Sequence, residues 1–285
     1  FNYNKNFSWK KFFKFFNQAW FYQVVIILLA YLTSLETFSK STLLNNLSPF
    51  FNAYWYVFCY LCLYLLSPFL NRLILNLDQK EHKMLIILLL FLFSFIPFVT
   101  NQESIVNNGL TLVNFILLYF IGSYLKKYPI NNNFHFKNYS KNKLQIILFI
   151  GFVLFGLLHF SAYWLGIGAT SYNNSFLVRL GNIFANAFST YSAPFVICMS
   201  VCYFLWFSTL NIKSKTINFI ASLVFGVYLI HDNRIIRAHL YYWLDINNDR
   251  LITSYSIIPK ILIAIVIIFV GCIIIEFIRQ KIFKF

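Results

Sequence analysis

The chain has 285 residues, of which 60% are hydrophobic, 21% aromatic and only 11% charged. A soluble domain carries about 25% charged residues, so this composition excludes a water-soluble globule, a disordered chain and a disulfide scaffold. It leaves an integral membrane protein. The net charge of +15 invites a nucleic-acid interpretation, but basic loops that flank apolar spans give the same sum, and we expect no nucleic-acid partner.

Apolar runs long enough to cross a bilayer recur along the whole chain. A hydrocarbon core of about 30 Å needs roughly 20 apolar residues in a helix. The sequence predicts eight such helices, near residues 15–35, 52–70, 84–100, 110–125, 144–165, 190–210, 217–231 and 257–278. We therefore expect an all-α fold, a polytopic transmembrane helix bundle in which residues 1–285 form a single domain.

The basic residues predict how these spans are oriented. With residues 1–14 in the cytoplasm, 17 of the 23 Lys and Arg residues fall in cytoplasmic segments, and the excess alternates correctly across eight spans. Positive charge is retained on the cytoplasmic side of membrane proteins. Both ends of this chain are therefore predicted to be cytoplasmic. The largest outer segments are then about 166–189 and 232–256.

One candidate site lies where the seventh span reaches the outer face. There the chain reads Tyr228-Leu229-Ile230-His231-Asp232-Asn233-Arg234. Ionisable groups at a membrane edge are costly unless they face water or a bundle interior, so His231 and Asp232 are candidate catalytic residues. Neighbours in a helix point to different sides and need not form a relay. The alternative is an interfacial helix cap with snorkelling arginines.

Two further patterns favour binding. Tyr54-Trp55-Tyr56 opens the second span and is typical of an interfacial aromatic belt, although aromatic rings also stack on sugars. Lys11 and Lys14 share one helix face at the cytoplasmic surface. They suit the phosphates of a cytosolic donor or, equally, anionic lipid head groups. Cys59 and Cys62 form a lone pair without further ligands nearby, so we predict no metal site.

Two stretches resemble a known family. Residues 54–71, from Tyr54-Trp55-Tyr56 to Ser67-Pro68-Phe69-Leu70-Asn71, and residues 225–233, Phe-Gly-Val-Tyr-Leu-Ile-His-Asp-Asn, are similar to the acyltransferase-3 membrane family. The similarity is closest to bacterial members that O-acetylate surface polysaccharides, and it covers nearly the whole chain. It implies a ten-helix bundle that carries an acyl group, commonly acetyl, from cytosolic acyl-CoA to a sugar hydroxyl at the outer face. It also implies the bacterial cytoplasmic membrane as the location.

The resemblance also assigns residues. The family's Arg-x-x-Arg donor motif matches Lys11 and Lys14, which keep the charge but lose the guanidinium fork. On the acceptor side it implies Tyr54, Trp55 and Asn233. The family's catalytic histidine lies in its first helix, which by this resemblance would precede Phe1, and none of the five histidines occupies its place: His82, His135, His159, His231 and His239. We therefore expect an N-terminally truncated chain, eight of ten helices, that is inactive by itself.

The residues also leave other functions open. A transporter or flippase for lipid-linked sugars needs the same spans, outer aromatics and basic inner loops, but normally shows internal repeats. A polysaccharide polymerase normally has a large arginine-bearing outer loop. The expected partners in every case are the bilayer and a polysaccharide or glycolipid. For an acyltransferase, acyl-CoA is a co-substrate, and we expect no bound cofactor.

Overall fold

The computed structural model describes the chain in nine stretches, with gaps between them: residues 7–36, 39, 54–100, 106–129, 139–170, 174–186, 190–210, 212–244 and 257–283. In these stretches the regular structure is helical, without a strand, so the all-α prediction is confirmed. The chain divides into two compact units. Unit 1 is Phe1–Phe7 with Cys62–Ile212, and unit 2 is Ser8–Leu61 with Lys213–Phe285. The prediction of one functional domain stays a prediction.

Each predicted span corresponds to a helix. These helices are α1 (Trp9–Leu32), α3 (Trp55–Asn76), α4 (Gln79–Leu90) with its continuation η2 (Phe91–Phe95) and α5 (Ile96–Thr100), α6 (Leu112–Lys127), α7 (Lys141–Thr170), α9 (Pro194–Thr209), α10 (Lys215–His231) and α13 (Ile257–Ile282).

Not all of these helices are long enough to cross a bilayer. Five described helices have the length and apolar character of a span, or six if α10 and the helix after it, bent by 79°, count as one. By contrast, α6 and α9 have 16 residues each and a rise of about 24 Å, short of the roughly 30 Å core. The prediction of a helical membrane protein is therefore confirmed. The count of eight spans stays a prediction.

Two helices lie in segments that the sequence predicted only as outer connections. They are α8 (Ser175–Asn186) and α11 (Arg234–Trp243). Neither contains a continuous apolar run, and in α11 the basic residues Arg234 and Arg237 share ten positions with Ile, Leu, Tyr and Trp. Helices with one polar and one apolar side are typical of the membrane–water interface. A search for apolar runs misses such helices because polar residues interrupt their apolar positions once in every turn.

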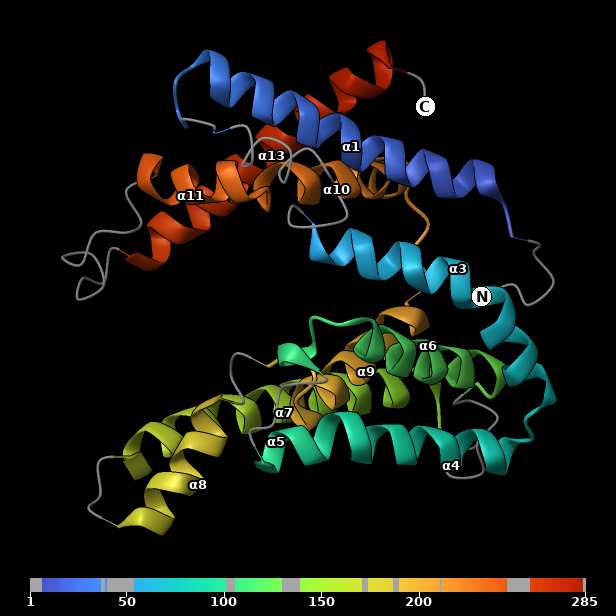
Figure 1. Ribbon diagram of the computed structural model, residues 1–285. Coiled ribbons are helices and arrows are strands. Elements are labelled where there is room, and N and C mark those ends of the chain that lie inside the picture. Colours follow the sequence, from blue (N-terminus) through green and yellow to red (C-terminus); the bar gives the residue numbers. More distant parts are fainter. Residues whose placement is uncertain are drawn as a thin grey trace. The chain divides into compact units, whose positions relative to one another are not determined.

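In unit 1, α7 packs against both α8 and α9, and α4 packs against α6 (Figure 1). A buried core of Leu117 and Ile121 from α6 and Ile197 from α9 holds the helices together. The chain turns from α3 into α4 at a capping box formed by Asp78 and Glu81, which satisfies two backbone N–H groups reciprocally.

In unit 2, α1, α10 and α13 lie side by side (Figure 1). The core is formed by α1, the first turns of α3, α10 and α11; its buried members are Ala19, Tyr22, Ile26, Ile27, Ala30, Tyr54, Val57, Leu61, Leu229 and Ile235. The alanines on α1 allow neighbouring helices to approach closely, as small residues do between membrane helices.

A buried carboxylate joins α1 to α13. Glu276 is fully buried and accepts hydrogen bonds from Tyr22 Oη (2.6 Å) and Gln18 Nε2 (3.1 Å), both on α1. From α13 itself it accepts two bonds from Arg279, by Nε (2.9 Å) and Nη2 (2.7 Å), and one from Gln280 Nε2 (2.8 Å). The three-residue spacing of Glu276 and Arg279 by itself indicates only a local ion pair. The two contacts from α1 make it a link between helices distant in sequence.

Gly226 provides the space for this carboxylate. A Cβ placed on Gly226 of α10 would lie 2.5 Å from Cγ, Cδ and Oε2 of Glu276. An unattached carboxylate could swing aside, but five hydrogen bonds hold this one, so the side chain cannot move without breaking them. The glycine therefore lets α10 approach the polar network between α1 and α13.

We predict that Gly226→Ala lowers the free energy of unfolding by about 1–3 kcal/mol, because the added methyl group overlaps a fixed side chain. Gly271→Ala is the matched control. A Cβ at Gly271 in α13 meets nothing within 4 Å, and alanine is the better helix former by up to about 1 kcal/mol. Thermal unfolding of the two variants in one detergent measures the difference. Equal midpoints would contradict this account of Gly226.

Candidate functional site

The break between α10 and α11 brings charged and polar side chains together in unit 2. Asp232 is the C-cap of α10, and Asn233 is the N-cap of α11. The two helices meet at 79°. The Asn233 carboxamide oxygen accepts the Ile235 backbone N–H (3.1 Å), which is the usual way in which asparagine starts a helix.

Asn233 also fixes the start of α3. Its Nδ2 donates to Tyr54 Oη and to Gln23 Oε1, both at 2.8 Å, while Tyr54 Oη donates to the Leu229 carbonyl (2.7 Å). Tyr54 and Asn233 are each 1% exposed. Both therefore act as positioning residues that join α1, α3, α10 and α11.

The geometry fixes the tautomer of His231. Its Nδ1 lies 2.7 Å from the Val227 carbonyl oxygen. Because a carbonyl can only accept, Nδ1 carries a proton, and in the neutral ring the lone pair is therefore on Nε2. The side chain is partly exposed, and no described residue hydrogen-bonds to Nε2. In this orientation, Nε2 of His231 can accept a proton from a molecule bound beside the α10–α11 break.

Asp232 does not orient this histidine. Its carboxylate pairs with Arg237 Nη1 at 3.0 Å, one turn into α11, and the arginine side chain is half exposed. Neighbouring positions on a helix point in different directions, so adjacency in sequence does not bring the two groups together here. Such an exposed pair contributes little to stability. It holds the Asp232 carboxylate beside the first turn of α11.

The ring of Tyr228 contacts His231, and Tyr54 and Tyr56 pack against that ring. The Tyr228 ring centroid is 6.5 Å from that of His231, 6.0 Å from Tyr54 and 5.5 Å from Tyr56. Trp55 is 38% exposed and lies edge-on to Tyr56 at 6.0 Å. The aromatic triplet therefore separates: Tyr54 is a buried anchor, whereas Trp55 and Tyr56 offer partly exposed ring surface.

An aromatic row runs from this corner along α10 towards the first half of α1. Phe225 stacks on Phe15 with centroids 4.1 Å apart, and its ring is parallel to that of Tyr228 at 6.4 Å. Positions 225 and 228, and positions 228 and 231, are each three residues apart, so the members of each pair are neighbours on the surface of α10. Over these six residues the helix rises about 9 Å.

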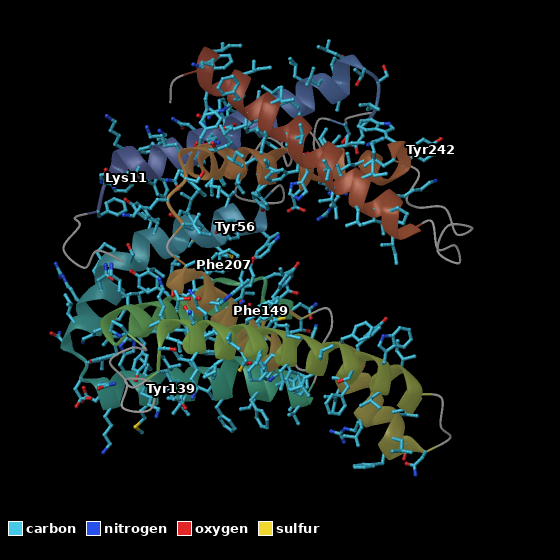
Figure 2. All side chains as sticks on the ribbon, turned by 180° about the vertical axis from the view of Figure 1, so that it is seen from behind. Lys11, Tyr56, Tyr139, Phe149, Phe207 and Tyr242 are labelled. Carbon is cyan, nitrogen blue, oxygen red and sulfur yellow. The ribbon has the colours of Figure 1, made fainter. Side chains whose placement is uncertain are left out.

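The predicted donor-binding lysines lie near the N-terminal end of α1. Lys11 and Lys14 lie in its first turns and are exposed; Figure 2 shows Lys11 near the N-terminal end of the helix. Lys14 directly precedes Phe15, the first ring of the aromatic row. Gln18, one turn after Lys14, donates to Glu276, so the buried network holds this half of α1 in place.

All the residues that the sequence singled out as site candidates belong to unit 2. The structure brings Tyr54, Asn233 and His231 to one corner and places Lys11 and Lys14 apart from it on α1. In the described part of the chain, no three His, Cys, Asp or Glu side chains gather as a metal site would require.

Sequence reasoning missed Gln18, Gln23 and Gly226. A signal existed for the two glutamines, because polar side chains within a membrane span are costly and normally face a partner. The first span contains Gln18 and Gln23, five residues apart. The role of Gly226 had no signal of its own, since it depends on a carboxylate 50 positions away.

Comparison with known proteins tests the identity of the chain. A search of curated proteins finds no significant match, and neither does a search of solved structures. The sequence profile of the acyltransferase-3 family, described as an acyltransferase domain, matches residues 3–277. This match covers almost the full length and includes both stretches that carried the resemblance. The chain therefore belongs to the acyltransferase-3 family of membrane acyltransferases.

Proposed function

We propose that the protein transfers an acyl group, in the simplest case acetyl, from cytosolic acyl-CoA to a hydroxyl of a cell-surface or exported polysaccharide, in the bacterial cytoplasmic membrane. Family membership supports acyl transfer. The observation that carries the acceptor side is the orientation of His231, whose Nδ1 is bonded to a carbonyl and whose ring lies beside the partly exposed Tyr228 ring at the α10–α11 break. Aromatic rings beside a base suit a sugar, whose C–H faces pack against them.

On the donor side, Lys11 and Lys14 bind the phosphates of acyl-CoA. Both side chains are exposed, and neither forms an ion pair with a described residue. Lysine attracts phosphate as a point charge without the bidentate geometry of arginine. Because Lys14 adjoins Phe15, a donor held there has the aromatic row of Phe225 and Tyr228 leading from it towards His231.

On the acceptor side, we assign the role of general base to His231, in place of the upstream histidine that the family resemblance implies: its Nε2 accepts the proton of the sugar hydroxyl as the oxygen attacks the thioester carbonyl carbon. The new C–O ester bond forms, the C–S bond breaks, and the CoA sulfur leaves with the electron pair and takes up the proton. Tyr54 and Asn233 hold the α10–α11 break at which this histidine lies. Trp55 packs against the sugar ring.

For the donor site, we predict that the double variant Lys11→Gln, Lys14→Gln raises the KM for acyl-CoA about three- to thirty-fold, because two exposed charge contacts of modest strength are lost. The kcat should change little, since such contacts bind substrate and transition state alike. Initial rates with the protein expressed from its complete coding sequence measure both constants.

Two further variants sharpen the donor test. Lys11→Arg, Lys14→Arg should lower KM, because the guanidinium fork matches a phosphate. Lys83→Gln, which removes an exposed cation from α4 in unit 1, should leave KM unchanged. An equal rise in KM for Lys83→Gln and for the α1 double variant would mean that only general surface charge matters, and would contradict a site at α1.

For the acceptor site, we predict that His231→Gln lowers kcat about 10²- to 10⁴-fold, the usual contribution of a general base. His239→Gln is the matched control, because the Nδ1 of His239 on α11 has the same kind of bond, to the Ile235 carbonyl at 3.0 Å. Asp232→Ala combined with His231→Ala should be no worse than His231→Ala. Unchanged transfer in that double variant would remove both residues from the mechanism.

A further inference from the structure

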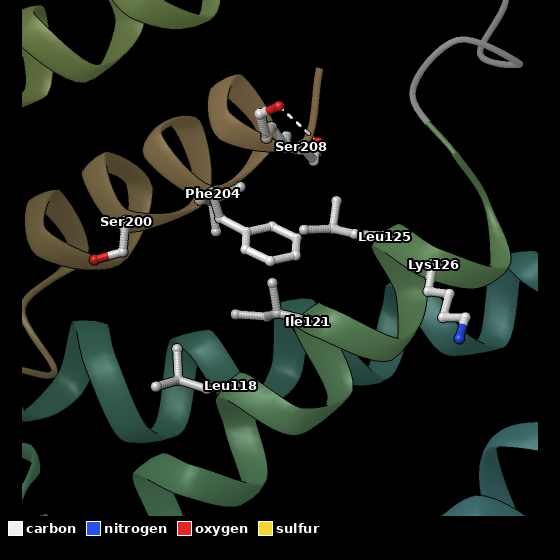
Figure 3. Close-up of a pocket in the computed structure, with 10 residues that line it drawn as sticks. Leu118, Ile121, Leu125, Lys126, Ser200, Phe204 and Ser208 are labelled. Carbon is white, nitrogen blue, oxygen red and sulfur yellow. Dashed lines mark hydrogen bonds between the residues drawn. The ribbon is translucent and has the colours of Figure 1, made fainter. Parts of the chain in front are cut away.

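A groove in unit 1 lies between α6 and α9, and none of its lining residues is assigned to the proposed reaction. Its volume is about 520 Å³, within the range of small-molecule pockets. Figure 3 shows Phe204 of α9 pointing towards Ile121 and Leu125 of α6. The main apolar lining residues are Leu118, Ile121 and Leu125 from α6 and Val201, Phe204 and Leu205 from α9.

The groove adjoins the packed core of unit 1, and its lining is mainly apolar. Ile121 is a buried core residue of unit 1, and Leu125 and Val201 pack against that core. Ser208, which also lines the groove, donates its hydroxyl to the Leu205 carbonyl (2.7 Å). A serine bonded to its own helix presents little polar surface. The interior therefore suits a hydrocarbon chain better than a polar metabolite.

Lys126 lies at one end of the groove and is the charged residue among the described residues that line it. The two lysines that end α6 differ in what they contact. Lys127 donates to the carbonyls of Ile74 (2.9 Å) and Leu77 (2.7 Å) and so caps the end of α3. Lys126 is exposed and forms no hydrogen bond or ion pair with a described residue. Its positive charge is therefore available at one end of the apolar groove.

We propose that this groove binds one anionic phospholipid, with an acyl chain along α6 and α9 and the phosphate at Lys126. The chain belongs to a membrane family, and α7, which packs against α9, has the length and apolar character of a span. Lipid is thus the surrounding medium of these helices. A basic group at the end of a groove between membrane helices is the arrangement that binds anionic head groups.

Photo-crosslinking tests this without any acyl-transfer readout. The purified protein is placed in phosphatidylcholine nanodiscs that contain a trace of phosphatidylglycerol with a diazirine on one acyl chain. A second sample contains phosphatidylcholine with the same modified chain. Labelled peptides are located by mass spectrometry. We expect labels within residues 118–126 and 200–208, with phosphatidylglycerol labelling about five-fold stronger, the preference that one lysine near a head group provides.

Variants assign the preference to the groove. Lys126→Gln should reduce phosphatidylglycerol labelling to the phosphatidylcholine level, whereas Lys83→Gln should not. Ser200→Trp, at an exposed lining position, should block both lipids, with chromatographic behaviour confirming that the variant is folded. Equal labelling by the two lipids, labels spread over α4 and α7, or displacement of the lipid by acyl-CoA would each overturn the proposal. A protein without acyl-transfer activity would still give a clear result.

Discussion

The structure of unit 2 depends on one constraint: a carboxylate buried among membrane helices must find all its donors within the protein. Glu276 finds them on α13 and, across the helix interface, on Tyr22 and Gln18 of α1. An isolated buried charge would cost several kcal/mol, so the helices that supply its partners cannot separate cheaply. Gly226 adds α10 to the same arrangement because only a residue without Cβ fits against the carboxylate. The network thereby holds α1, the helix that carries Lys11 and Lys14, in a fixed position.

The same requirement shapes the acceptor corner. A helix that stops inside an apolar environment leaves backbone N–H and C=O groups without partners. At the α10–α11 break, Asn233 satisfies the start of α11, and Tyr54 reaches the Leu229 carbonyl near the end of α10. His231 in turn donates a hydrogen bond from Nδ1 to the Val227 carbonyl. Asn233 and Tyr54 are thus occupied in holding the break, whereas His231 Nε2 forms no hydrogen bond with a described residue and is the atom that the proposed mechanism uses. In the proposed mechanism, Asn233 and Tyr54 hold the break and the nearby His231 supplies the reactive atom.

The sequence predicted the fold class and the place of every long helix, since apolar runs follow directly from the thickness of a bilayer. It could not predict α8 and α11, whose apolar residues are interrupted by polar ones. It placed His231, Asp232, Asn233 and Tyr54 near one site, because the motifs that carried the family resemblance contain them. It did not predict that Tyr54 and Asn233 are buried anchors or that Gln23 completes the cluster, because those contacts join residues 175 to 210 positions apart. The pairing of Asp232 with Arg237 depends on the sharp bend between α10 and α11, which the sequence does not show.

The central claim is that an acyl group enters from CoA on one side of the membrane and leaves on a glycan at the other. Proteoliposomes of uniform orientation, containing the protein expressed from its complete coding sequence, test it most directly. Acyl-CoA with a radiolabelled acyl group is supplied to the side bearing Lys11 and Lys14, and polysaccharide only to the opposite side. We predict ester-linked label on the polysaccharide and release of CoA on the donor side. Label that appears only when both substrates share one side, or none at all, would contradict the claim.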